Sequence, residues 1–117
     1  MNNKPKYSLY LNAKYAIDGL VHVLKTEVSF KIELLFFLLI FLTIIIFNFT
    51  IMEKAMLIST AFLVLIVELL NSAIENVVDL VTKEIKPLAK NAKDIASTAV
   101  LFSILLHILI WVLILWI

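Results

Sequence analysis

Apolar residues dominate three long stretches of the chain, which are 32–52, 55–74 and 95–117. A helix needs about 20 apolar residues to cross a hydrocarbon layer of about 30 Å, so each stretch is long enough to span a membrane. The first two stretches leave room only for a tight turn between them, at Thr50 to Lys54. The pattern therefore predicts an all-α membrane protein with three transmembrane helices.

The segment before the first stretch follows a different pattern. Between about 6 and 27, apolar residues recur at helical spacing, at Leu9, Ala13, Ala16, Leu20 and Leu24. Such an amphipathic helix is suited to lie in the membrane interface with its lysines in water. Ordinary packing against the three spans is an equally good interpretation, and the two do not exclude each other. The segment has no continuous apolar core or small-residue cleavage site, so we expect no signal peptide and a single domain over 1–117.

The composition narrows the class of protein further. Hydrophobic residues make up 63% of the chain and charged residues only 16%, fewer than the surface of a soluble domain needs. The net charge of +1 offers no basic surface, so we expect no nucleic-acid partner. The chain has no cysteine and one glycine, which excludes a disulfide framework, a cysteine-based metal site and a glycine-rich phosphate loop.

The lysines predict how the spans are oriented. Five lysines precede the first span, at Lys4, Lys6, Lys14, Lys25 and Lys31. Four more lie between the second and third spans, at Lys83, Lys86, Lys90 and Lys93. Only Lys54 lies in the other connection. Positive residues are retained on the cytoplasmic side, so we expect the N-terminus and the connection 75–94 in the cytoplasm and the C-terminus outside, with Trp111 and Trp116 at the outer interface.

Polar residues follow one another along a single helix face at the end of the second stretch, at Glu68, Asn71, Glu75 and Asp79. At about 100° per residue, they fall within an arc of roughly 80°. Glu68 lies 13 residues past Ala55, which is about 20 Å into the hydrocarbon from the outer side. A carboxylate at that depth costs about 3 kcal/mol, so a solvated helix end can explain Asp79 but not Glu68. We therefore interpret Glu68 as a functional residue.

Other charged residues are expected at the same membrane level. Glu27 and Glu33 flank the start of the first span, and Lys93 and Asp94 stand at the start of the third. Carboxylates together with phosphate oxygens suit Mg²⁺, and a lysine supplies a point charge for a polyphosphate. Together with an acid in the lipid zone, this set indicates phosphoryl transfer to a lipid alcohol.

Several motifs resemble one known family. ELLNSAIENVVD at 68–79 and AKDIASTAVL at 92–101 closely resemble the prokaryotic diacylglycerol kinases, which are small integral-membrane enzymes. The resemblance extends to TEVSFKIE at 26–33, MLIST at 56–60 and WVLILW at 111–116. It implies a kinase of diacylglycerol or, in a sister branch, of undecaprenol, with ATP as donor and Mg²⁺ as cofactor. It also implies a homotrimeric helical bundle with a surface helix and with active sites between protomers.

The resemblance assigns roles to individual residues. The catalytic positions are Glu68, which matches the general base for the lipid hydroxyl, Asn71, which matches the residue that orients it, and Asp79. The metal carboxylates are Glu27 and Glu75. The nucleotide-binding positions are Tyr15, Glu27, Glu75, Glu84, Lys86, Lys93 and Asp94. The lipid-substrate positions are Glu33, Glu68 and Ser97.

The chain also departs from the family pattern. It contains no arginine, and Ser8 stands where many relatives carry one in the surface helix. Ile85 and Lys86 replace the aromatic and histidine residues of the best-known branch. These departures affect the expected nucleotide contacts more than the catalytic ones.

Three alternatives remain for the function, and two histidines need an interpretation. KPLAKNAKD at 86–94 is similar to the undecaprenol branch, whereas ELLNSAIENVVD favours diacylglycerol. A small ion-translocating subunit or a purely structural membrane subunit would account for a lone intramembrane acid, but neither needs the other acids and Lys93.

We expect His22 to be solvated and His107 to make a hydrogen bond to a neighbouring helix. The family and the lysine pattern together predict the bacterial cytoplasmic (inner) membrane as the location.

The orientation is directly testable. A reporter that is active only in the cytoplasm should be inactive when fused after Ile117, because the third span carries the C-terminus to the outer side. The same reporter inserted in the connection 75–94 should be active. Activity after Ile117 would contradict the predicted orientation.

Overall fold

The computed structural model describes residues 8–116, and these residues form four helices and no strand. The helices are α1 (Leu9–Thr26), α2 (Val28–Ile46), α3 (Ile51–Val81) and α4 (Pro87–Trp116). The last three are long and apolar enough to cross a membrane, so the prediction of an all-α protein with three such helices is confirmed. Lys4, Lys6, the start of the expected surface helix and Ile117 lie outside the described residues.

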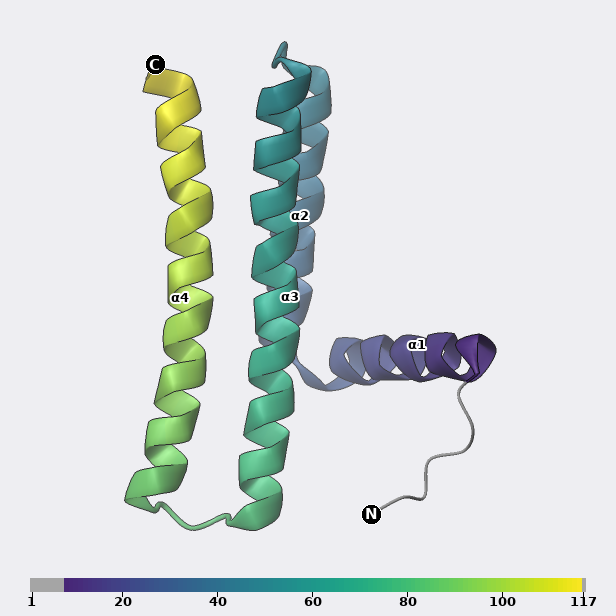
Figure 1. Cartoon of the computed structure of the whole chain (residues 1–117), viewed down its shortest axis with the longest axis vertical. Helices are drawn as coiled ribbons and strands as arrows, with labels where there is room; N and C mark the ends of the chain where they lie inside the picture. The colour runs from purple at the N-terminus through teal and green to yellow at the C-terminus, as the bar shows by residue number, and fades with distance from the viewer. Residues whose placement is uncertain (1–7, 117) are drawn as a thin grey trace.

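Helices α2, α3 and α4 run side by side, and α1 projects sideways from them (Figure 1). The Ser8 hydroxyl caps α1 by accepting a hydrogen bond from the Leu11 backbone N–H at 3.3 Å. Helix α1 ends where Glu27 takes up an extended backbone, with φ −111° and ψ 106°, and α2 begins at the next residue. A single residue therefore produces the change of direction between the two helices.

The turn between α2 and α3 differs from the expected one. The apolar stretch 32–52 is not one helix, because α2 ends at Ile46 and the turn runs from Phe47 to Thr50. Thr50 and Glu53 form a capping box: the Thr50 N–H donates to Glu53 Oε1 at 2.9 Å, and the Glu53 N–H donates to Thr50 Oγ1 at 3.1 Å. This pair satisfies two of the backbone N–H groups at the helix start, so α3 begins at Ile51 although the sequence remains apolar there.

Both helices at the other end continue beyond the apolar stretches. Helix α3 extends seven residues past 74, to Val81, and α4 begins at Pro87, eight residues before 95. Proline suits the first turn of a helix because its missing N–H has no intrahelical partner there. Figure 1 shows these ends of α3 and α4 passing the level of α1. They carry the segment 75–94 away from the rest of the bundle.

Helix α3 is the centre of the packing, with α2 on one side and α4 on the other. A small core of Ile44, Leu57 and Ile110 joins the three helices towards the α2–α3 turn. Many other apolar side chains of α2 and α4 are exposed, including Phe36 at 59% and Phe102 at 66%. Such exposure suits helices that face hydrocarbon or another subunit.

His107 joins α3 and α4 inside the apolar region, as predicted. Its Nε2 accepts a hydrogen bond from Trp111 Nε1 at 2.9 Å, and its Nδ1 lies 2.8 Å from Thr60 Oγ1. An indole N–H can only donate, so the ring proton of His107 is on Nδ1 and donates to Thr60. The Thr60 hydroxyl then donates to the Met56 carbonyl at 2.9 Å. His22, in contrast, is exposed on α1, as expected.

The contribution of this link can be measured with Thr60→Val, which keeps the side-chain shape and removes the acceptor. We expect the free energy of unfolding in detergent micelles to fall by about 1 kcal/mol, the size of an interhelical hydrogen bond in a membrane protein. Thr43→Val is the matched control, because within residues 8–116 the Thr43 hydroxyl bonds only the Leu39 carbonyl of its own helix. Equal losses in the two variants would show that the link to His107 contributes nothing.

Candidate functional site

Glu68 is buried in the middle of α3, with only 5% of its surface exposed. Its Oε1 accepts a hydrogen bond from the Ser29 hydroxyl at 3.2 Å. Ser29 lies in the first turn of α2, so the contact joins the two helices near the end of α2 that adjoins α1. An acid in an apolar environment is costly unless it is hydrogen-bonded, and here one hydroxyl supplies part of that compensation.

Three further carboxylates surround Glu68. Glu27 and Glu75 lie close enough to Glu68 to repel its charge, and Glu68 acts in the same way on Glu33. The four acids come from the α1–α2 junction, α2 and α3, which meet at this level. Such a concentration of like charge is unfavourable in the absence of cations, so the arrangement favours a cationic or metal-bound ligand.

Asn71 lies between the buried and the exposed parts of the site. Its exposed fraction is 9%, and its Nδ2 donates to Glu75 Oε1 at 3.0 Å. The resemblance implied that Asn71 orients Glu68, but in the structure its amide contacts Glu75. Among residues 8–116, the buried Asn71 Oδ1 has no hydrogen-bond partner. A buried acceptor of this kind can take a hydrogen bond from a ligand hydroxyl or from a metal-bound water.

A pocket of about 240 Å³ lies between the far ends of α3 and α4. It includes Asp79, Glu84 and four lysines, which are Lys83, Lys86, Lys90 and Lys93. Lys93 Nζ donates to Asp79 Oδ1 at 2.7 Å, and Lys86 Nζ lies 3.5 Å from Glu84 Oε2. Clustered ammonium groups are suited to bind a polyphosphate, because each contributes a mobile point charge.

The remaining predicted site residues are less closely grouped. Asp94 accepts from Lys90 Nζ at 2.6 Å within α4, on the exposed surface beside the lysine pocket. Tyr15 on α1 and Ser97 on α4 are both exposed, and within the described range neither lines the lysine pocket. The structure of one chain therefore gathers the acids in one group and the lysines in another, and it places neither Tyr15 nor Ser97 in the lysine pocket.

The carboxylates can be tested for their fit to Mg²⁺. No group of three or more His, Asp or Glu side chains in the part of the chain that the structure describes is close enough to hold a metal ion. Mg²⁺ in phosphoryl-transfer sites uses only one or two protein carboxylates and completes its shell with phosphates and water. The Glu27 side chain does not cap α2, and Glu75 is only partly buried, so these two residues fit such a role.

Sequence reasoning missed three residues of this arrangement. Lys83 and Lys90 were used only for orientation. Lys90 and Lys93 are three residues apart and are neighbours on one face of α4, which was a usable signal, whereas Lys83 lies in the non-helical connection between α3 and α4. Ser29 lies one helical turn before Glu33 and could have been noticed for the same reason. Its contact with Glu68 depends on the packing of α2 on α3, which the sequence does not show.

Three membrane-length helices define a small helical membrane protein. It carries a buried acid, Glu68, and a lysine pocket at the far ends of α3 and α4. Residues 14–115 match the family model described as prokaryotic diacylglycerol kinase. The chain belongs to this family, as the resemblance of its motifs predicted.

Individual relatives are similar over different lengths. A diacylglycerol kinase of Escherichia coli strain K12 is 48% identical over 63 residues, which are 54% of this chain and 52% of the relative. One from Pseudomonas aeruginosa is 40% identical over 76% of this chain and 73% of the relative. One from Haemophilus influenzae is 32% identical over 86% and 85%, respectively. The chain thus spans about half the length of the E. coli relative and most of the other two.

Proposed function

We propose that this protein transfers the γ-phosphoryl group of ATP to the hydroxyl of diacylglycerol, which yields phosphatidic acid. The observation that carries the proposal is the burial of Glu68 between membrane-length helices, at the head of a polar face that leads to the lysine pocket. A kinase whose acceptor is a lipid needs an acid at the lipid boundary and a cationic pocket beside water. The family membership and the names of the relatives support the same activity.

Glu68 is the general base of the proposed reaction. Its carboxylate takes the proton of the lipid hydroxyl while that oxygen forms a bond to the γ-phosphorus. The bond from the γ-phosphorus to the β–γ bridging oxygen breaks, and ADP leaves. Ser29 holds one carboxylate oxygen by its 3.2 Å hydrogen bond and so fixes the direction in which the other can act. Asn71 links this centre to Glu75 and offers its free carbonyl oxygen to a substrate hydroxyl.

The nucleotide binds on the water side of Glu68 in this proposal. Lys86 and Lys93 contact its phosphates, Asp79 holds Lys93 in place, and Glu84 lies in the same pocket. Asp94, beside the pocket, and Tyr15, on α1 and outside the pocket of a single chain, are assigned to the nucleotide from the family resemblance alone. Glu27 and Glu75 hold Mg²⁺. When bound, this ion neutralises negative charge on the phosphates as the transferred group moves.

The level of α1 supports the proposed position in the bacterial inner membrane. A second pocket is lined by Ala16, Leu20 and Val23 of α1 and by Leu69 and Asn76 of α3, so α1 lies beside that part of α3. If α1 lies in the interface, Glu68 is just within the hydrocarbon and Glu75 is at the surface. The site then faces the cytoplasm, which supplies ATP.

We further propose that three copies assemble and share their sites. A single chain leaves Leu35, Leu38 and Phe102 exposed on α2 and α4, and it surrounds its acids with only three spans. Polar residues in a membrane are expected to face other helices and not lipid. Additional copies would cover these faces and complete the surroundings of Glu68.

Undecaprenol is the alternative acceptor, and an ion-translocating subunit is the alternative class. The lysine pocket favours a kinase, because proton or ion transfer through Glu68 has no use for a cationic site outside the membrane. Purified protein with MgATP should phosphorylate diacylglycerol faster than undecaprenol. A faster reaction with undecaprenol would assign the chain to the other branch, and no phosphorylation of any lipid would contradict the kinase function.

The two central acids should respond differently to substitution. Glu68→Gln should lower kcat by about 100-fold or more, which is the usual contribution of a general base, and should leave nucleotide binding nearly intact. Glu75→Gln should weaken metal and nucleotide binding, and raised Mg²⁺ should recover part of the rate. The measurements are kcat, KM for ATP and the Mg²⁺ dependence of the rate. Loss of nucleotide binding in Glu68→Gln, with normal binding in Glu75→Gln, would mean that the roles are reversed.

Lys93 should act through its positive charge. Lys93→Gln should raise KM for ATP about tenfold, because a charge-assisted hydrogen bond to phosphate is lost. Asp79→Asn should have a smaller effect, since an amide oxygen still accepts from Lys93. Lys54→Gln is the control, because Lys54 lies in the first turn of α3, at the opposite end of the helix. Equal KM values in Lys93→Gln and Lys54→Gln would remove Lys93 from the nucleotide site.

A further inference from the structure

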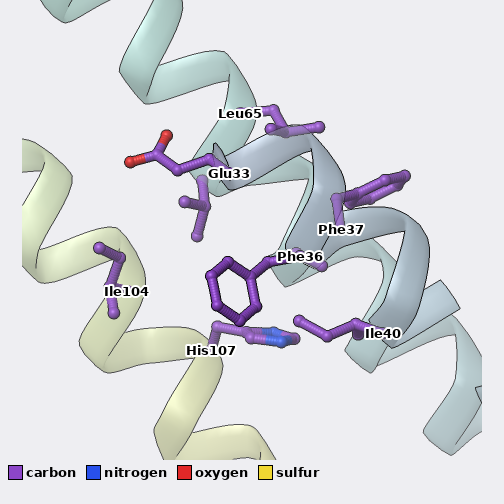
Figure 2. A pocket seen from close by; sticks show the side chains of 9 residues that line it. Glu33, Phe36, Phe37, Ile40, Leu65, Ile104 and His107 are labelled. Atoms are coloured by element: carbon purple, nitrogen blue, oxygen red, sulfur yellow. The ribbon is translucent and has the colours of Figure 1, made fainter. Parts of the chain in front are cut away.

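An apolar groove of about 220 Å³ runs between α2, α3 and α4 (Figure 2). Phe36 and Ile40 of α2, Leu65 of α3 and Ile104 of α4 form much of its wall. The groove exists because α2 and α4 each pack on α3. Its lining residues lie on helices that are long and apolar enough to cross a membrane.

The two ends of the groove have different chemistry. Glu33 stands at one end, and its carboxyl group points towards α4 in Figure 2. Among residues 8–116, the buried Glu33 Oε2 has no hydrogen-bond partner. Glu33 also lies within electrostatic reach of Glu68, so this end of the groove adjoins the proposed catalytic site. A buried unpaired carboxyl oxygen at the mouth of an apolar groove suits a ligand with a hydroxyl at one end.

Two residues bound the opposite end of the groove. His107 and Ile40 lie there, and Ile40 packs against the core of Ile44, Leu57 and Ile110. Both nitrogens of His107 are engaged, one by Trp111 and the other by Thr60. The imidazole therefore has no free polar atom to offer the groove and cannot turn aside without breaking a hydrogen bond. It forms a fixed wall.

We propose that this groove binds one hydrocarbon chain of the lipid substrate, and that His107 is a specificity-determining residue that limits how much of the chain can enter. The inference rests on the proposed function, since it takes the substrate hydroxyl to lie near Glu33 and Glu68. From Glu33 to Ile40 the groove follows seven residues of α2, which is about 10 Å at 1.5 Å per residue. Only the part of the chain next to the glycerol fits within that length, and the remainder extends into the bilayer.

The test uses a series of saturated diacylglycerols, from dihexanoyl to dimyristoyl, presented to the full-length protein in mixed micelles. For the natural protein, KM should fall as the chains lengthen and then become constant once the groove is filled. His107→Ala removes the wall, so the chain length at which KM becomes constant should increase by at least one member of the series. Ala61→Leu narrows the groove from α3 and should shift that chain length in the opposite direction.

Two control variants separate the shape of the wall from the stability of the bundle. His107→Phe keeps a ring of similar size but loses both hydrogen bonds, so it should lower stability without moving the chain length at which KM becomes constant. Leu105→Ala shortens an exposed side chain of α4 that lies outside the groove and should leave the profile unchanged. Identical profiles in the natural protein, His107→Ala and Ala61→Leu would overturn the proposal.

A binding measurement keeps this inference separate from the proposed activity. In Trp116→Phe, Trp111 is the sole tryptophan. A diacylglycerol brominated along one chain should quench the Trp111 fluorescence, and the quenching should saturate at a low concentration of the lipid. Ala61→Leu should weaken the quenching. Quenching without phosphorylation would contradict the proposed function and keep the groove. No quenching would overturn the assignment of the groove to lipid. A change of subunit number in Ala61→Leu, with an unchanged chain-length profile, would show that another copy fills the groove and would also overturn that assignment.

Discussion

Burying a charged carboxylate among apolar helices is unfavourable in free energy, and the other features of this structure depend on how that charge is compensated. Glu68 is 5% exposed on a helix that is otherwise suited to cross a membrane. Ser29 donates one hydrogen bond to Glu68, whereas the neighbouring Glu75 and Glu27 repel its negative charge. A site of this kind is stable only together with cations, protons or further subunits. Apolar faces left uncovered on α2 and α4 offer room for such further subunits.

The acids and the lysines occupy different environments, and α3 connects them. The acids lie where α1, α2 and α3 meet, whereas the lysines line a pocket at the far ends of α3 and α4. Because α3 is continuous for 31 residues, the two environments keep a fixed distance and rotation relative to each other. One continuous helix thereby connects the buried acid to the lysine pocket at its far end.

The sequence predicted the parts that depend on composition and periodicity, and missed those that depend on packing. The three spans and the single polar face of α3 follow from residue spacing alone. The start of α3 did not, because the Thr50–Glu53 capping box outweighs the apolar continuity around it. The contact between Ser29 and Glu68 requires the rotation of α2 against α3, which no local pattern encodes. His107 was predictable in kind but not in partner, since a buried imidazole in a membrane needs some acceptor or donor.

The junction between α1 and α2 has a mechanical consequence. Glu27 is the only residue between the two helices, so no flexible loop separates them. A tilt or shift of α1 must therefore be taken up by the backbone torsions at this residue, and it displaces the attached carboxylate. Helices that lie in an interface are sensitive to lipid charge and curvature. The geometry of the acidic site is in this way coupled to the physical state of the bilayer surface on which α1 would rest.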